Sequence, residues 1–264
     1  MEIFDGRKEA KKLDKEIIEH LKQTQVTPVL GIIQVGNNEA SNKYVALKQR
    51  VGEKLGIDVR VYKYADTLSD NELEENITQT LNNEEITKII VQLPLPRQSL
   101  YKILNKIPQE KDVDILSHKA MEKYYAGDLS FSSPVVKACE YFLDSISIKN
   151  KDKKAIIVGG GDLVGKPIAY FLKTNGWDIK IIEDYKRGKS LNADLLILSA
   201  GIAKLVSGED IARDTNVIDF GSSVITNKTV GDLDMETNLD HLGTISPSPG
   251  GMGPLVVRFL LRCI

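Results

Sequence analysis

Short runs of apolar and β-branched residues alternate along this chain with longer segments in which apolar positions recur at helical spacing. Runs of the first kind predict buried strands, and segments of the second kind predict amphipathic helices. Strands that alternate with helices are typical of parallel sheets covered by helices. The pattern therefore predicts an α/β fold.

The first half of the chain is expected to contain three strands and three helices. The strands are predicted at 28–36, 58–64 and 87–96, and the helices at 8–23, 41–56 and 69–83. In the second of these helices, Ser41 or Asn42 is the expected N-cap and Gly56 is the expected stop.

The second half begins with a predicted helix at 133–146. Residues 154–184 then read as strand, glycine-rich loop, helix and strand, and two short buried strands are predicted at 193–201 and 215–223. An apolar helix is expected after the Pro/Gly-rich loop near the end of the chain. We therefore predict two α/β lobes, the second a Rossmann-like dinucleotide-binding domain, with a cleft between them, a common location for small-molecule sites.

Composition narrows the classes of partner. The chain has 264 residues, enough for one or two domains, and its net charge of −2 gives no excess of basic surface for nucleic acid or an anionic membrane. Apolar runs are far shorter than a membrane span, and the opening residues do not read as a signal peptide. Two cysteines and three scattered histidines predict neither a disulfide framework nor a metal site. We expect a cytoplasmic protein with a small-molecule ligand.

The segment VGGGDLVGKP follows a predicted strand and opens a predicted helix. Gly159, Gly161 and Gly165 would let the backbone turn tightly and approach a pyrophosphate at the helix N-terminus. The spacing has one residue more than the standard dinucleotide fingerprint, and a tight structural turn is the alternative. The other candidate cofactor contacts in this loop are Gly160, Asp162 and Val164.

The residues after the next predicted strand bear on which nicotinamide cofactor is bound. Glu183 and Asp184 end that strand, and an acid there can accept hydrogen bonds from a ribose 2′-hydroxyl and would repel a 2′-phosphate. Lys186 and Arg187 follow at once and could do the opposite. The sequence therefore leaves NAD and NADP open.

A second group of candidates lies in the first half. Tyr44 and Lys48 are four residues apart and share a helix face, while Gln92 and Asp114 end other elements at the same predicted edge of the sheet. Each has an ordinary alternative. Tyr44 could be part of the core, Lys48 could extend along apolar surface, Gln92 could cap a strand and Asp114 could be a turn residue.

Several motifs in order along the chain carry a resemblance to a known family. They are DGRKEAKKL, VGNNEASNKYVALK, VQLPLP, KDVD, VGGGDLVGKP and SPSPGGMGP. From its start to its end the chain resembles the methylenetetrahydrofolate dehydrogenase/cyclohydrolase family of folate one-carbon metabolism. The resemblance implies oxidation of methylene-tetrahydrofolate with NAD or NADP, then hydrolysis of methenyl-tetrahydrofolate to formyl-tetrahydrofolate.

The resemblance also implies roles for the first group of candidates. Tyr44 would line the folate pocket, Lys48 would be the catalytic lysine, and Gln92 would be its hydrogen-bonding partner. Asp114 would be the carboxylate that holds the pterin ring.

Further along the chain, the resemblance implies a loop beside the folate, formed by Pro249, Gly250 and Gly251. The family fold has two α/β lobes, its final helix returns to the first lobe, and homodimers through the cofactor lobe are common. The implied domains are a folate-binding domain of residues 1–117 with 250–264, and an NAD(P)-binding domain of residues 118–249.

Physical chemistry suggests why an amide would accompany the lysine. Hydride transfer from the methylene carbon leaves a methenyl cation without moving a proton, so the protein mainly positions two rings. Hydrolysis needs an activated water, which suits a lysine that spends time neutral. The cationic substrate lowers the pKa of Lys48, whereas a carboxylate in contact would raise it. We therefore expect Gln92 to orient Lys48 without adding charge.

The chain departs from the family pattern mainly on the cofactor side. Gly160 and Gly161 stand where the family has arginine and serine, and Ile115 replaces the glycine that usually follows Asp114. The loop change puts preference for NADP in doubt. It leaves two alternatives, a cyclohydrolase with weak or lost dehydrogenase activity and a non-catalytic folate- or nucleotide-binding paralogue.

Overall fold

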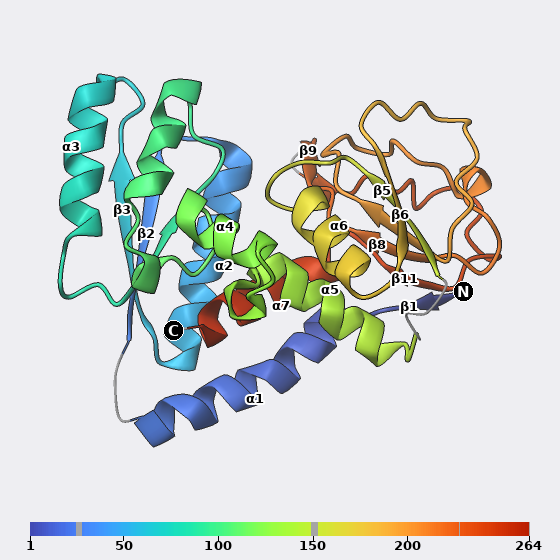
Figure 1. Ribbon diagram of the computed structural model, residues 1–264, viewed down its shortest axis with the longest axis horizontal. Coiled ribbons are helices and arrows are strands. Elements are labelled where there is room, and N and C mark those ends of the chain that lie inside the picture. Colours follow the sequence, from blue (N-terminus) through green and yellow to red (C-terminus); the bar gives the residue numbers. More distant parts are fainter. Residues whose placement is uncertain (25–27, 149–152, 227, 264) are drawn as a thin grey trace. The chain divides into compact units, whose positions relative to one another are not determined.

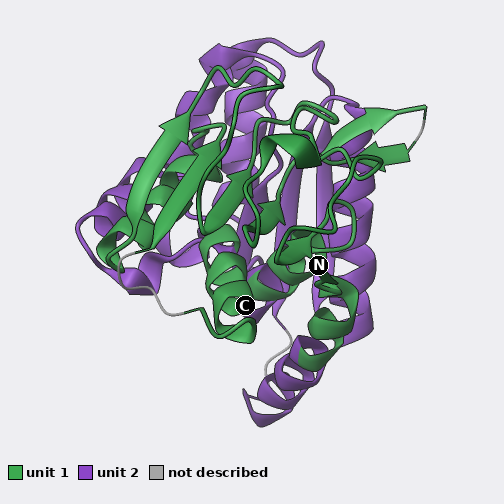
Figure 2. Ribbon diagram, turned by 90° about the vertical axis from the view of Figure 1, so that its right-hand side faces the viewer, with its two compact units in different colours: residues 1–12, 135–259 green, residues 13–134, 260–264 purple. Residues whose placement is uncertain are grey.

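The computed structural model describes residues 1–24, 28–148, 153–226 and 228–263. Figure 1 labels the helices and strands along the chain. The chain forms two compact units, coloured in Figure 2: unit 1 is Met1–Lys12 with Val135–Phe259, and unit 2 is Leu13–Pro134 with Leu260–Ile264. The predicted division into a folate-binding domain and an NAD(P)-binding domain stays a prediction.

Unit 2 contains a three-stranded parallel sheet with strand order β3-β2-β4. The strands are β2 (Val29–Val35), β3 (Asp58–Tyr64) and β4 (Lys88–Val91). In Figure 1 the helices α2 (Glu39–Leu55) and α3 (Asp70–Leu81) lie on opposite sides of this sheet. Apolar residues of β2, β4 and α3 form one buried core cluster. The three strands and the helices between them were predicted, and they are confirmed.

Shorter helical segments complete unit 2. They are η1 (Gln98–Lys106), η2 (Gln109–Lys111), α4 (His118–Tyr125) and η3 (Leu129–Phe131). None of these was predicted, because short helices and 3-10 turns show too few periods of the apolar pattern to stand out. The first helix, α1 (Gly6–Thr24), and the last, α7 (Met252–Arg262), each have residues in both units.

Unit 1 contains a six-stranded, all-parallel sheet with strand order β1-β11-β8-β7-β5-β6. Its strands are β1 (Glu2–Ile3), β5 (Lys154–Val158), β6 (Asp178–Ile182), β7 (Leu195–Leu198), β8 (Asn216–Asp219) and β11 (Thr244–Ser246). The other elements are α5 (Pro134–Ser145), α6 (Gly165–Thr174), η4 (Gly208–Asp210) and the hairpin of β9 (Ser223–Ile225) and β10 (Lys228–Val230). This confirms the predicted α/β fold and the Rossmann-like second domain.

The predicted N-cap of α2 is wrong. The helix begins earlier, and the Asn38 side chain accepts the N–H of Ser41 at 3.0 Å. Ser41 is instead a buried helical residue whose hydroxyl donates to the carbonyl of Leu93 at 3.3 Å. The predicted stop is confirmed, since Gly56 ends the helix in the left-handed conformation that glycine adopts readily.

Two expectations from composition can be compared with the described residues. Within them, no helix combines the length and the apolarity that crossing a membrane would need. The same part of the chain also lacks any group of three or more acidic, histidine or cysteine side chains arranged to hold a metal ion.

Candidate active site

Lys48 lies buried at the carboxyl end of the unit 2 sheet. It is carried by α2, and only 3% of its surface is exposed. Its Nζ donates a hydrogen bond to Oε1 of Gln92 at 3.1 Å and lies 4.7 Å from the centre of the Tyr44 ring. A buried ammonium or amine is costly without partners, and these contacts supply a neutral acceptor and an aromatic face.

Gln92 is held so that its amide oxygen points at the lysine. It directly follows β4, and its backbone N–H donates to the carbonyl of Ile33 at 2.8 Å, continuing the strand pairing. Its side-chain Nε2 donates to the carbonyl of Leu93 at 2.7 Å, so the amide orientation is fixed at both ends. Pro94 follows Leu93 through a cis peptide bond.

Burial and one acid set the protonation of this group. Burial lowers the pKa of Lys48, and the carboxylate of Asp114 opposes that shift. Burial raises the pKa of Asp114; the charge of Lys48 opposes this rise, and the charge of the nearby Asp112 adds to it. Burial and Asp114 also raise the pKa of Tyr44, which therefore stays a neutral phenol. The lysine is thus biased toward its neutral amine before any substrate is present.

The structure separates the two acids of the KDVD motif. Asp112 is buried and accepts the N–H groups of Leu116 and Ser117 at 3.0 and 2.8 Å, so its carboxylate shapes the turn. Asp114 is the one whose charge is coupled to Lys48. Between them and α4, Ile115 has φ 57°, a left-handed conformation that is unfavourable for a β-branched residue. This explains why glycine suits that position.

We name the four residues Tyr44, Lys48, Gln92 and Asp114 the Lys48 cluster. Lys48 contacts both Gln92 and Tyr44, and Asp114 is coupled electrostatically to Lys48 and Tyr44. Their assigned roles in catalysis stay predictions. The arrangement offers a desolvated amine, a neutral orienting amide, an aromatic face and an acid, which is a set able to move protons at a bound substrate.

The predicted folate loop lies in unit 1, just before α7. Gly250 has φ 111°, and the N–H of Gly251 donates to the carbonyl of Pro247 at 2.8 Å. A Cβ on Gly6 would come within 1.7 Å of the carbonyl oxygen of Gly251, so the start of α1 packs directly on this loop. Pro249 is exposed and follows a cis peptide bond. A contact of this loop with folate stays a prediction.

The glycine loop joins β5 to α6 as predicted. Gly159 has φ 93°, and a Cβ on Gly165 would lie 2.1 Å from the carbonyl oxygen of Gly159. Helix α6 begins at Gly165 without a hydrogen bond from a capping side chain, and its positive end faces the loop. The Lys166 N–H donates to the carbonyl of Gly161 at 3.1 Å and Pro167 has no N–H, so an anion there would be held mainly by N–H groups of the loop. This backbone cradle fits the pyrophosphate of a dinucleotide. Asp162 is exposed and pairs with Lys166 at 2.6 Å, while Val164 is the N-cap residue.

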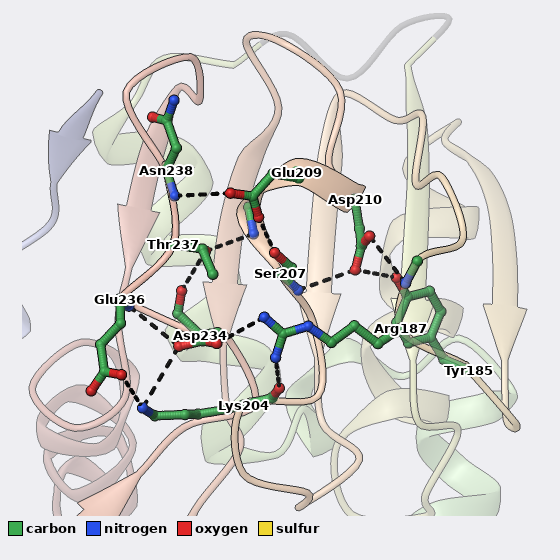
Figure 3. A network of polar contacts seen from close by, with 12 residues as sticks. Tyr185, Arg187, Lys204, Ser207, Glu209, Asp210, Asp234, Glu236, Thr237 and Asn238 are labelled. Atoms are coloured by element: carbon green, nitrogen blue, oxygen red, sulfur yellow. Dashed lines mark hydrogen bonds and ion pairs between the residues drawn. The ribbon is translucent and has the colours of Figure 1, made fainter.

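The charged residues that follow β6 have different partners. The Glu183 carboxylate accepts the N–H of Gly160 at 3.0 Å, whereas Asp184 and Lys186 are simply exposed. Arg187 donates to the Asp234 carboxylate at 2.9 Å and to the Lys204 carbonyl at 3.1 Å, within the polar network of Figure 3. The structure therefore brings Glu183 to the glycine loop and directs Arg187 to an acid.

Sequence reasoning missed two buried acids that organise the cofactor side. Asp232 accepts the N–H groups of the segment 200–202 at 2.7, 3.0 and 2.8 Å. Asp219 ends β8 and accepts three more N–H groups, from 221, 232 and 233. Burial raises the pKa of Asp219 to about 7. For Asp219, the available signal was an acid at the end of a buried apolar strand, in VIDFG.

Both halves of the chain match one protein family in sequence. The sequence pattern of the tetrahydrofolate dehydrogenase/cyclohydrolase catalytic domain matches residues 4–114, and that of the same family's NAD(P)-binding domain matches residues 133–264. The chain is 32% identical to the bifunctional protein FolD of Lactobacillus delbrueckii subsp. bulgaricus, over 99% of this chain and 95% of that protein. It is 34% identical to the bifunctional protein FolD of Moorella thermoacetica, over 99% and 96%.

Solved structures agree with these matches. The bifunctional FolD enzyme of Campylobacter jejuni superposes with a TM-score of 0.87 at 30% identity, covering 100% of this chain and 96% of that one. The Trypanosoma brucei FolD, solved with NADP and an inhibitor, superposes with a TM-score of 0.89 at 25% identity, covering 99% and 95%.

Proposed function

The chain belongs to the tetrahydrofolate dehydrogenase/cyclohydrolase family, and we propose that the Lys48 cluster is its folate-handling centre. The enzyme is bifunctional: it oxidises methylene-tetrahydrofolate with a nicotinamide dinucleotide and hydrolyses the methenyl product to formyl-tetrahydrofolate. The single observation that supports the placement is the buried Lys48 amine, held 3.1 Å from a neutral amide oxygen.

On the cofactor side, the glycine loop from Gly159 to Gly165 would hold the pyrophosphate by the backbone N–H groups that follow Gly160, whose own N–H donates to Glu183. When bound, the oxidised nicotinamide supplies the hydride acceptor for the methylene carbon. The chain's own residues need to position the reactants and exclude water, because this step moves no proton.

In the hydrolytic reaction, the neutral amine of Lys48 takes a proton from the attacking water. The resulting ammonium returns a proton to the nitrogen that leaves the one-carbon unit. Gln92 aims the amine without adding a charge, and burial keeps the neutral form accessible. In this scheme the ring of Tyr44 stacks on the substrate, and Asp114 hydrogen-bonds to the pterin.

Three finer points belong to the same proposal. The loop of Pro249, Gly250 and Gly251 lines the folate site, the protein works in the cytoplasm, and it assembles as a homodimer through its cofactor unit. The family resemblance supports the loop and the homodimer, and the presence of only two cysteines, too few for a disulfide framework, supports the cytoplasm. The packing of α1 on Gly251 adds that the loop backbone is held in one arrangement.

Replacing the lysine tests the proposal. Lys48→Met keeps the length of the side chain and removes the amine, so hydrolysis of methenyl-tetrahydrofolate should fall by at least ~100-fold, the scale of losing a general base. The decay of methenyl absorbance without dinucleotide measures this reaction directly. Lys43→Met, on the exposed side of the same helix where Lys43 pairs with Glu39 at 2.6 Å, is the matched control.

Three results are informative. Hydrolysis at the parent rate in Lys48→Met would refute the role of the lysine. A parent enzyme that hydrolyses but forms no methenyl product with either dinucleotide would instead be a cyclohydrolase without dehydrogenase activity. Folate binding with neither activity would identify a non-catalytic paralogue.

A further inference from the structure

The strand that follows the glycine loop ends against the loop itself. β5 and β6 are parallel neighbours with Val158 opposite Ile182, so the residues after each strand meet at one edge of the sheet. There Glu183 accepts the N–H of Gly160 at 3.0 Å. A carboxylate therefore lies on the loop that the proposed function assigns to the dinucleotide pyrophosphate.

The contact makes positions 160 and 183 depend on one another. A Cβ on Gly160 would lie 2.3 Å from Oε1 of Glu183 and 2.9 Å from Cγ2 of Ile181. Any side chain at 160 would have to displace the carboxylate from its place. The carboxylate thus occupies the space that a longer residue at 160 would need, and the loop presents a negative charge there.

We propose that Glu183 makes this enzyme select NAD over NADP, by accepting hydrogen bonds from the adenosine ribose and repelling a 2′-phosphate. The inference depends on the proposed position of the pyrophosphate on the glycine loop. With that end of the cofactor at the helix N-terminus, the ribose reaches the end of the second strand, where an acid binds the 2′-hydroxyl. A phosphate in the same place would put two anions in contact.

Two of the cations in this part of the chain, Arg187 and Lys204, are already engaged. Arg187 directs its guanidinium to the carboxylate of Asp234 and to the carbonyl of Lys204. The Lys204 ammonium pairs with Glu236 at 2.6 Å, and Figure 3 shows both pairs in one network. A 2′-phosphate would have to break an existing ion pair to recruit Arg187. Lys186 and Lys189 are exposed as well, and the parent dissociation constants in the test below measure whether they offset the charge of Glu183.

The test measures binding at the ribose end alone, without hydride transfer. Titration calorimetry with ADP-ribose and with 2′-phospho-ADP-ribose gives two dissociation constants for the full-length protein. We expect the phosphorylated ligand to bind at least tenfold more weakly. Glu183→Gln keeps an acceptor for the N–H of Gly160 and removes the charge, so the ratio should fall at least fivefold, through tighter binding of the phosphorylated ligand.

Two further variants make the test specific. Asp178→Asn removes an exposed acid at the opposite end of the same strand and should leave the ratio within twofold of the parent. Asp184→Asn tests whether the neighbouring acid, and not Glu183, sets the ratio of the two dissociation constants. A ratio that changes with Asp184→Asn and not with Glu183→Gln overturns the assignment. Thermal unfolding of each variant should match the parent.

The remaining outcomes are equally decisive. Equal or tighter binding of the phosphorylated ligand by the parent overturns the inference. If the parent binds neither ligand, the pyrophosphate placement fails as well, and the inference fails with it. Methenyl hydrolysis without dinucleotide reports separately on the Lys48 cluster, so the folate proposal is judged independently.

Discussion

The two candidate regions are built in different ways. The Lys48 cluster depends on side chains: a buried amine, an amide, a ring and an acid. The glycine loop depends on backbone: it offers N–H groups, and its contacts are set by the absence of side chains at Gly159, Gly160 and Gly165.

This difference governs how each region can change. A side-chain site loses its chemistry when one member is replaced, because no second buried lysine is found among the described residues to supply an amine. A backbone site keeps its chemistry as long as its N–H groups keep their positions, so neighbouring side chains such as that of Glu183 can differ. The chain matches the family in both regions, residues 4–114 with the catalytic domain and residues 133–264 with the NAD(P)-binding domain. By the resemblance of its motifs, the departures that we expect lie on the cofactor side.

Among these tests of the difference between the two regions, we expect the largest effect from Gly165→Ala, which should impair oxidation and spare hydrolysis. The new Cβ would lie 2.1 Å from the carbonyl oxygen of Gly159, which forces α6 away from the loop. Oxidation with NAD or NADP should fall at least ~10-fold, the scale of a misplaced reactant, because the pyrophosphate loses its N–H groups. Both absorbance assays on one preparation measure the effect, and dinucleotide-free hydrolysis should change less than twofold.

The matched control for this variant is Gly253→Ala. A Cβ there meets nothing within 4 Å, and the position lies in α7. Equal losses of both reactions in Gly165→Ala would contradict the separation of the two regions, as would unimpaired oxidation.

A smaller effect is expected on the stability of unit 1, where the buried acid Asp219 has a structural role. The folded-state pKa of Asp219, about 7, lies above its ordinary value of 3.8. The folded protein therefore keeps a proton that the unfolded chain releases, and the contribution of Asp219 to stability is lost as pH rises from about 4 to about 7.

Asp219→Asn removes this titration. The unfolding free energy of the parent minus that of the variant should fall over that pH range, by at most about 1.4 kcal/mol per pH unit, and should be flat above it. Urea unfolding at several pH values checks the slope. A difference that is flat between pH 5 and pH 7 would contradict the assignment.

The sequence predicts the fold wherever the apolar pattern is strong. The buried strands from Val29, Lys88 and Leu195 are apolar runs, and the structure confirms them. The strand Glu2–Ile3 is two exposed residues that pair with Thr244–Ile245, so its existence depends on chain that follows much later. No local pattern could reveal it.

The candidate site divides in the same way. Lys48 and Gln92 were predicted because each lies in a recognisable motif, Lys48 within a predicted helix and Gln92 in a predicted strand end. The contact of Glu183 with Gly160 requires knowing that β6 lies beside β5, and the pairing of Arg187 with Asp234 joins segments 47 positions apart. The N-cap of α2 was misread because Ser41 and Asn42 are equally good capping types, and the choice of Asn38 depends on loop geometry.

The central claim is that a neutral amide keeps the buried lysine usable as a base. Gln92→Glu tests it most directly, because it places a carboxylate where the amide oxygen lies 3.1 Å from Nζ and so raises the pKa of Lys48. The measurement is the pH profile of methenyl hydrolysis, beside Gln98→Glu, which adds the same charge at an exposed position.

For Gln92→Glu we predict that the rise of hydrolysis with pH moves upward by about one unit or more, with on the order of a tenfold loss near neutral pH. The Gln98→Glu profile should follow the parent. A Gln92→Glu profile that coincides with the parent, or a faster rate at neutral pH, would contradict the account.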